Sequence, residues 1–111
     1  MPTDPVFQPF RVDVHHEGGR VRIVPVGELD LATAPEVDEA LRAAANLDHQ
    51  GIALDLREVI FMDSSGLRLI LRWNAAARDE GRSFGVIRGD DVVQRVFDAT
   101  RVAEHLTFVD P

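Results

Sequence analysis

The chain contains no cysteine, which excludes disulfides, thiolate nucleophiles and cysteine-based zinc sites. It also has no apolar run near the roughly 18 residues that cross a bilayer. Its first residues lack the basic start and apolar segment of a signal peptide. We therefore expect a cytoplasmic protein that has no membrane segment, metal or cofactor.

Positive charge is also scarce. The chain has 12 basic against 19 acidic side chains, a formal net charge of -7. Nucleic acid binding draws most of its affinity from cations placed against phosphates, so this balance argues against nucleic acid as a partner. A protein or a small molecule is the expected partner. The sequence leaves the oligomeric state open.

What the chain does have is enough apolar sequence for one core: 111 residues, of which 45 % are apolar. Three prolines in residues 1–9 indicate a flexible N-terminal arm, and residues 10–111 form one domain. The periodicity of apolar residues, together with turn and capping residues, predicts strands near 10–15, 21–26, 52–56, 83–87 and 106–109. The same features predict helices starting near residues 33, 64 and 90. The order β-β-α-β-α-β-α-β predicts an α/β fold with a mixed, mostly parallel sheet packed against helices.

Three local features refine this prediction. Gly18-Gly19 supplies the positive φ angles of a tight hairpin turn. Pro25 cannot donate to a strand ladder, so we expect it at a bulge, an edge or a strand end. The spacing from Thr33 to Glu36 is that of a capping box at the start of the first helix.

Two adjacent serines open the second helix, in the segment Phe61-Met62-Asp63-Ser64-Ser65-Gly66-Leu67. The simplest interpretation is that both cap the helix, because serine readily accepts hydrogen bonds from a first turn. One cap is sufficient, however. If Ser64 takes that position, the hydroxyl of Ser65 is free to face solvent.

This segment resembles the phosphorylation motif of STAS-domain anti-sigma factor antagonists, a bacterial family. The segment 27–35, Gly-Glu-Leu-Asp-Leu-Ala-Thr-Ala-Pro, is similar to the family's second signature, and residues 93–102 also resemble family members. The three landmarks occur in the family's order and together span roughly residues 10–109. They imply a STAS fold and a role in transcription regulation through protein–protein interaction.

The resemblance implies a regulatory cycle rather than an enzyme activity. In the family, the unmodified antagonist binds an anti-sigma factor, usually a serine kinase, and thereby releases a sigma factor. The kinase phosphorylates the second serine of the motif, here Ser65 with Ser64 as second choice, and a serine phosphatase reverses the modification. The implied partner-binding residues are Glu28, Leu29, Asp30, Asp63, Ser64, Ser65, Gly66 and Leu67.

Two other functions are weighed against this one. A serine hydrolase would need a G-x-S-x-G elbow, and neither serine has a glycine both two before and two after it. A STAS domain can instead serve as a small-molecule module for nucleotides or lipids, or as a scaffold, without a phosphorylation cycle. Trp73 and Leu69, one turn apart, either pack inside the protein or form an apolar contact for a partner.

Overall fold

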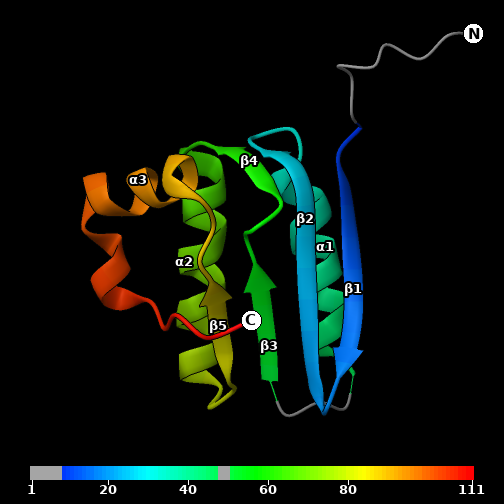
Figure 1. The fold of residues 1–111 in the computed structure, drawn as a ribbon. Helices are drawn as coiled ribbons and strands as arrows, with labels where there is room; N and C mark the ends of the chain where they lie inside the picture. The colour runs from blue at the N-terminus through cyan, green and yellow to red at the C-terminus, as the bar shows by residue number, and fades with distance from the viewer. Residues whose placement is uncertain (1–8, 48–50) are drawn as a thin grey trace, which may run out of the picture.

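The computed structural model describes residues 9–47 and 51–111, so the arm expected over residues 1–9 lies almost wholly outside the described residues. The described part forms a layered α/β fold (Figure 1). Its elements are β1 (Arg11–Glu17), β2 (Arg20–Leu29), α1 (Ala34–Ala45), β3 (Gly51–Asp55), β4 (Val59–Met62), α2 (Ser64–Asp79), β5 (Phe84–Ile87), α3 (Asp91–Thr100) and the 3₁₀ helix η1 (Val102–His105).

The sheet has the strand order β1-β2-β3-β5, and β4 pairs separately with β2. Only β1 and β2 are antiparallel; the pairs β2–β3, β2–β4 and β3–β5 are parallel. The hairpin turn has φ angles of 57° at Gly18 and 87° at Gly19, as its Gly-Gly sequence predicts. The expected mixed, mostly parallel sheet is confirmed.

Strand β2 changes partner along its length, and this positions the candidate site. Its first half pairs with β3 over residues 20–23, and its last residues pair with β4 over residues 27–29. Pro25 lies between these two pairings, so its missing backbone N–H removes no hydrogen bond to β3 or to β4. A register shift follows at Gly27, whose φ is 120°. The expectation that Pro25 itself lies at a bulge, an edge or a strand end is therefore wrong: Pro25 lies inside β2, opposite Val12 of β1, and the irregularity follows two residues later.

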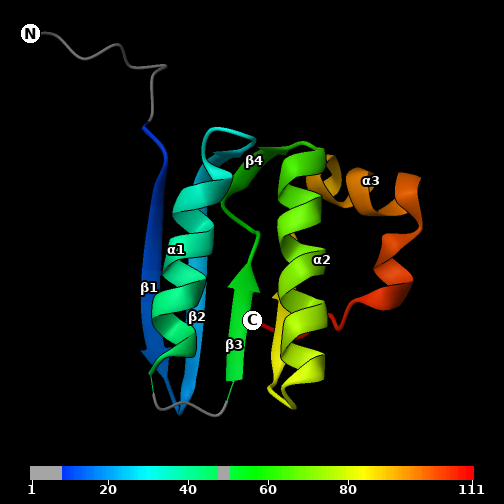
Figure 2. The ribbon, with the colours of Figure 1, turned by 180° about the vertical axis from the view of Figure 1, so that it is seen from behind.

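Helices α1 and α2 cover one face of the sheet, and α3 lies at the end where β4 is found (Figure 2). Each helix turns an apolar stripe inward. Within the described residues, the helix side chains with 2 % exposure or less are Val37, Leu41, Ala44, Leu69, Ile70, Val93 and Phe97. No helix in that part of the chain combines the length and apolar character needed to cross a membrane.

The strand expected at residues 106–109 is not formed; that segment makes a single parallel bridge, Val86 to Phe108. The chain then crosses the face of the sheet opposite α1 and α2 (Figure 1). Val109 packs so closely on Gly85 that a Cβ there would lie 2.5 Å from a Val109 methyl carbon. Arg20 donates to the carbonyl of Asp110 at 3.1 Å. The segment therefore pairs with β5 only at Val86, whose N–H donates to the carbonyl of Thr107 and whose carbonyl accepts from the N–H of Val109, each at 2.9 Å. The fifth strand is β4 instead.

Candidate functional site

The candidate site lies where the parallel strands β2 and β4 end side by side. Leu29 and Met62, the last residues of the two strands, are in register, and the N–H of Asp63 donates to the carbonyl of Leu29 at 3.2 Å. The loops that begin at Asp30 and Asp63 therefore start next to each other, and each leads into a helix. In α/β sheets such carboxyl edges are where binding sites usually form.

Asp63, and not Ser64, caps α2. One carboxylate oxygen of Asp63 accepts a hydrogen bond from the N–H of Ser65 at 2.8 Å. The expectation that Ser64 holds the cap is therefore wrong by one residue, because an aspartate at the preceding position can satisfy the same donors and adds a favourable charge at the helix N-terminus. Ser64 and Ser65 become the first two residues of the helix. Neither hydroxyl has a hydrogen-bond partner among the described residues.

Ser65 is accessible. Ser64 is exposed and Ser65 is half-buried at the edge of a shallow groove of about 270 Å³ between the starts of α1 and α2. The groove is lined by Leu31, Ala34, Pro35, Asp38, Ser65, Arg68, Leu69 and Arg72. No histidine is among these lining residues. Among the described residues there is also no cluster of His, Asp and Glu that could hold a metal.

The loop after β2 is held by its own side chains. Oδ1 of Asp30 accepts from the N–H groups of Ala32 and Thr33 at 3.0 and 3.1 Å. Thr33 Oγ1 donates to the carbonyl of Glu28 at 2.7 Å and accepts from the N–H of Asp30 at 2.9 Å. The capping box expected from Thr33 to Glu36 is therefore absent. The side chain of Thr33 bonds the loop that precedes α1 and makes no hydrogen bond to the first turn of the helix. The loop is preformed.

The eight residues that the sequence assigns to partner binding divide into two groups. Leu29, Gly66 and Leu67 are buried, so they support the site from inside and present no side chain to a partner. Glu28, Asp30, Asp63, Ser64 and Ser65 reach the surface. The parallel strands bring this second group together at one end of the fold.

Sequence reasoning missed the exposed apolar side chains beside this group. Leu31 is 75 % exposed, and Ile60 and Phe61 are 64 % and 45 % exposed. Phe61 is in register with Glu28 across the β2–β4 pair, and Leu31 lines the groove with Ser65. The sequence contained a signal for this exposure. Ile60 and Phe61 are adjacent apolar residues in a four-residue edge strand, and few other elements can cover such a strand. The surface thus combines carboxylates with exposed apolar side chains, and Arg68 and Arg72 line the groove at Ser65.

Gly66 fixes the distance between α2 and the strand ends. A Cβ at this position would lie 2.7 Å from Cγ of Met62 and 2.9 Å from Cγ of Leu29, and both of these residues are buried. The first turn of α2, which carries both serines, therefore packs directly on the ends of β2 and β4.

Gly66→Ala is expected to destabilise the protein by about 1–3 kcal/mol, because overpacking outweighs the better helix propensity of alanine. Urea unfolding measures the change. Ser64→Ala, in the same turn but exposed, is the control and should stay within about 0.5 kcal/mol of the unmodified chain. A Gly66→Ala protein as stable as the unmodified one would show that this turn does not rest on the strand ends.

Comparisons with known proteins agree on the kind of domain. Residues 11–109 match the family model described as "Mlab, STAS domain". An anti-sigma-B factor antagonist of Staphylococcus aureus is 31 % identical over 74 residues, covering 67 % of this chain and 68 % of the relative. An anti-sigma factor antagonist from Mycobacterium paratuberculosis has a similar structure, with a TM-score of 0.78, 23 % identity and coverage of 93 % and 87 % of the two chains. The Bacillus protein SpoIIAA has been solved in two forms. The unphosphorylated form has a TM-score of 0.71 and 20 % identity, covering 93 % of this chain and 88 % of that chain. The phosphorylated form has a TM-score of 0.66 and 19 % identity, covering 93 % and 91 %.

Proposed function

Because the chain belongs to the STAS-domain family of anti-sigma factor antagonists, we propose that it binds an anti-sigma factor in the cytoplasm and so releases a sigma factor. The anti-sigma factor is a serine kinase that binds while Ser65 is unmodified. Phosphorylation of Ser65 ends the binding, and a serine phosphatase restores it. The chain itself acts as a binding protein and not as an enzyme.

The observation that carries this proposal is the uncommitted hydroxyl of Ser65. Asp63 satisfies the cap of α2, so Ser65 contributes only its backbone N–H to the helix start. A kinase can therefore modify the hydroxyl without removing a hydrogen bond from the fold. The surrounding loops are held by their own contacts, such as that of Thr33 with Glu28, so the surface exists before any partner arrives.

Phosphorylation should act at the interface and leave the fold intact. A phosphoserine brings about -1.5 to -2 charges and three strong acceptors. At the N-terminus of α2 the helix dipole favours such a charge by roughly 0.3–1 kcal/mol. Asp63, Asp30 and Glu28 already make this end of the molecule acidic. The added dianion would place further negative charge beside these carboxylates, at the surface that the partner must contact.

The surface also indicates what the partner must offer. Three carboxylates and the exposed side chains of Leu31 and Phe61 lie on the same end of the fold. A complementary partner presents cationic groups around an apolar contact, because complementary potentials give an interface its specificity. Phosphorylation would add charge and bulk at the centre of such an interface.

Affinity purification from the source cell tests the proposal. The bait proteins are the unmodified chain, Ser65→Ala and Ser65→Asp, and the captured proteins are identified by mass spectrometry. We expect the first two to retain an anti-sigma factor with a kinase domain and Ser65→Asp to lose it. Identical partners for all three baits would contradict the proposed switch.

A further inference from the structure

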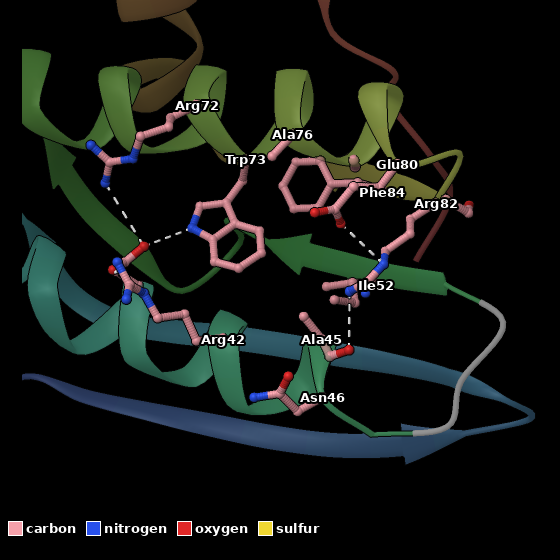
Figure 3. A pocket seen from close by; sticks show the side chains of 13 residues that line it. Arg42, Ala45, Asn46, Ile52, Arg72, Trp73, Ala76, Glu80, Arg82 and Phe84 are labelled. Atoms are coloured by element: carbon pink, nitrogen blue, oxygen red, sulfur yellow. Dashed lines mark hydrogen bonds and ion pairs between the residues drawn. The ribbon is translucent and has the colours of Figure 1, made fainter.

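A second and larger hollow lies between α1 and α2, farther along the helices from Ser65 (Figure 3). It has a volume of about 440 Å³. It adjoins the groove at Ser65, because Asp38 and Arg72 line both. Ligand sites in proteins typically enclose about 300–1,000 Å³, so the size is that of a small-molecule site.

The floor and one wall of this cleft are apolar. Ile52 of β3, Ala77 of α2 and Phe84 of β5 form the floor, and each is buried to more than 90 %. The half-buried ring of Trp73 forms the wall. Its indole N–H donates to Oδ1 of Asp38 at 2.8 Å, which ties the ring to α1 and fixes its orientation (Figure 3). The sequence left open whether Trp73 packs inside or contacts a partner; the ring does pack between the helices, and one part of it still faces the cleft.

The rim of the cleft has more hydrogen-bond donors than the protein uses. Arg42 donates through Nε to Oδ2 of Asp38, and Arg82 donates to the carbonyl of Ala45 and pairs with Glu80. Arg72 comes only to 3.8 Å of Asp38. Each guanidinium carries five N–H donors and no acceptor, so most of the donors at this rim have no partner among the residues that the structure describes. Both oxygens of Asp38 are already occupied by Trp73 and Arg42.

The charges around the cleft have the opposite sign from the chain as a whole. Three arginines and two carboxylates, those of Asp38 and Glu80, line it, which gives a local excess of one positive charge in a chain of net charge -7. Free cationic donors above an apolar floor suit a ligand that has an acidic group at one end and an apolar body at the other.

We propose that this cleft binds a small amphipathic anion, with an aromatic or alkyl body against Trp73 and Phe84 and its acidic group on the arginines of the rim. The ligand class follows from the lining residues alone and does not depend on the phosphorylation cycle. Because the cleft adjoins the groove at Ser65, a bound ligand would also lie next to the surface proposed for the anti-sigma factor.

The single tryptophan of the chain provides the test, since its indole N–H gives one distinct NMR cross-peak. The probe is 2-naphthoate, and naphthalene-2-carboxamide is its neutral counterpart with the same ring. We expect 2-naphthoate to shift the Trp73 cross-peak in a saturable manner, with a dissociation constant below about 1 mM. The amide should bind about tenfold more weakly, because it cannot form charge-assisted hydrogen bonds with the arginines.

Three variants complete the experiment. Arg42→Gln and Arg82→Gln test the two ends of the rim, and the variant that removes the arginine at the acidic group should weaken 2-naphthoate binding about tenfold. Arg95→Gln, which removes the same charge from the exposed surface of α3, should leave binding unchanged. Thermal unfolding and the dispersion of the spectra show that each variant is folded. The proposal is overturned if the cross-peak does not respond, if acid and amide bind equally, or if all three variants bind like the unmodified chain. None of these outcomes bears on the switch at Ser65, which is tested by partner capture.

Discussion

Ser65→Asp is expected to weaken binding of the anti-sigma factor about a hundredfold, which corresponds to about 2.8 kcal/mol. Asp63 and Asp30 already place carboxylates beside this position, because the N–H of Asp63 bonds the carbonyl of Leu29 and so joins the two loops. A further negative charge would have to be desolvated against the partner without a new cation to pair it. Isothermal titration calorimetry with the purified anti-sigma factor measures the change.

Two further variants separate charge from bulk. Ser65→Asn has nearly the shape of the aspartate variant and no charge, so it should lose much less affinity, and Ser65→Ala should bind like the unmodified chain. Circular dichroism should be the same for all, because the Asp63 cap does not involve the serine side chain. Equal losses for the Asp and Asn variants would show that shape and not charge blocks the interface. A lost helix in Ser65→Asp would refute the account of a preformed surface.

Most of the fold could be predicted because its signals are local. The strand near residues 10–15, the Gly18-Gly19 turn and the helix starts near residues 64 and 90 each depend on a few neighbouring residues, and the structure confirms them. Asp90, at the predicted start of the third helix, caps that helix by accepting hydrogen bonds from the N–H groups of Val92 and Val93. At these positions propensity, pattern and packing favour the same structure.

The errors arise where two local solutions are nearly equal and tertiary contacts decide between them. Asp63 and Ser64 are both good capping residues, and the hydrogen bond from Asp63 to Leu29 determines which of them precedes the helix. Thr33 could cap α1 or close the loop, and the nearby carbonyl of Glu28 selects the second. The same applies to residues 106–109, where Gly85 leaves room for Val109 on the face of the sheet.

The meeting of the two loops could be predicted from the sequence, but not which of their side chains reach the surface. Order along the chain suffices to bring Asp30 and Asp63 together, because parallel strands place their carboxyl ends at one edge. Burial does not follow from order: Leu29 is fully buried, whereas Leu31, two residues later, is 75 % exposed. The difference comes from the Asp30 turn, which directs the chain away from the core.

Asp55→Asn is expected to lower the free energy of unfolding by about 3 kcal/mol at neutral pH, because it breaks a buried ion pair from one side. Asp55 is 1 % exposed at the end of β3 and is the only charged side chain buried in the described part of the chain. Its carboxylate accepts from Arg22 at 2.9 Å and from Arg57 at 2.7 Å, and it also accepts from the N–H of Arg57 at 3.0 Å. The variant would leave two guanidinium groups without this partner. Glu17→Gln removes an exposed partner of the same Arg22 and should have a much smaller effect, which makes it the matched control.

The pH dependence of the same pair gives a second measurement with a definite sign. Burial alone would raise the pKa of Asp55, but the hydrogen bonds from Arg57 and Arg22 outweigh it and hold that pKa below its ordinary value. A carboxyl group with a lowered pKa in the folded state contributes its full stability above its unfolded pKa of about 3.9 and loses it as the pH falls through the folded value. Chemical unfolding of the unmodified chain and of Asp55→Asn, from about pH 7 to pH 2, measures this effect. The difference between their free energies of unfolding should be constant above about pH 5 and should shrink below about pH 4. A difference that persists undiminished in acid would mean that the charge on Asp55 contributes nothing and that the variant is unstable for reasons of shape alone.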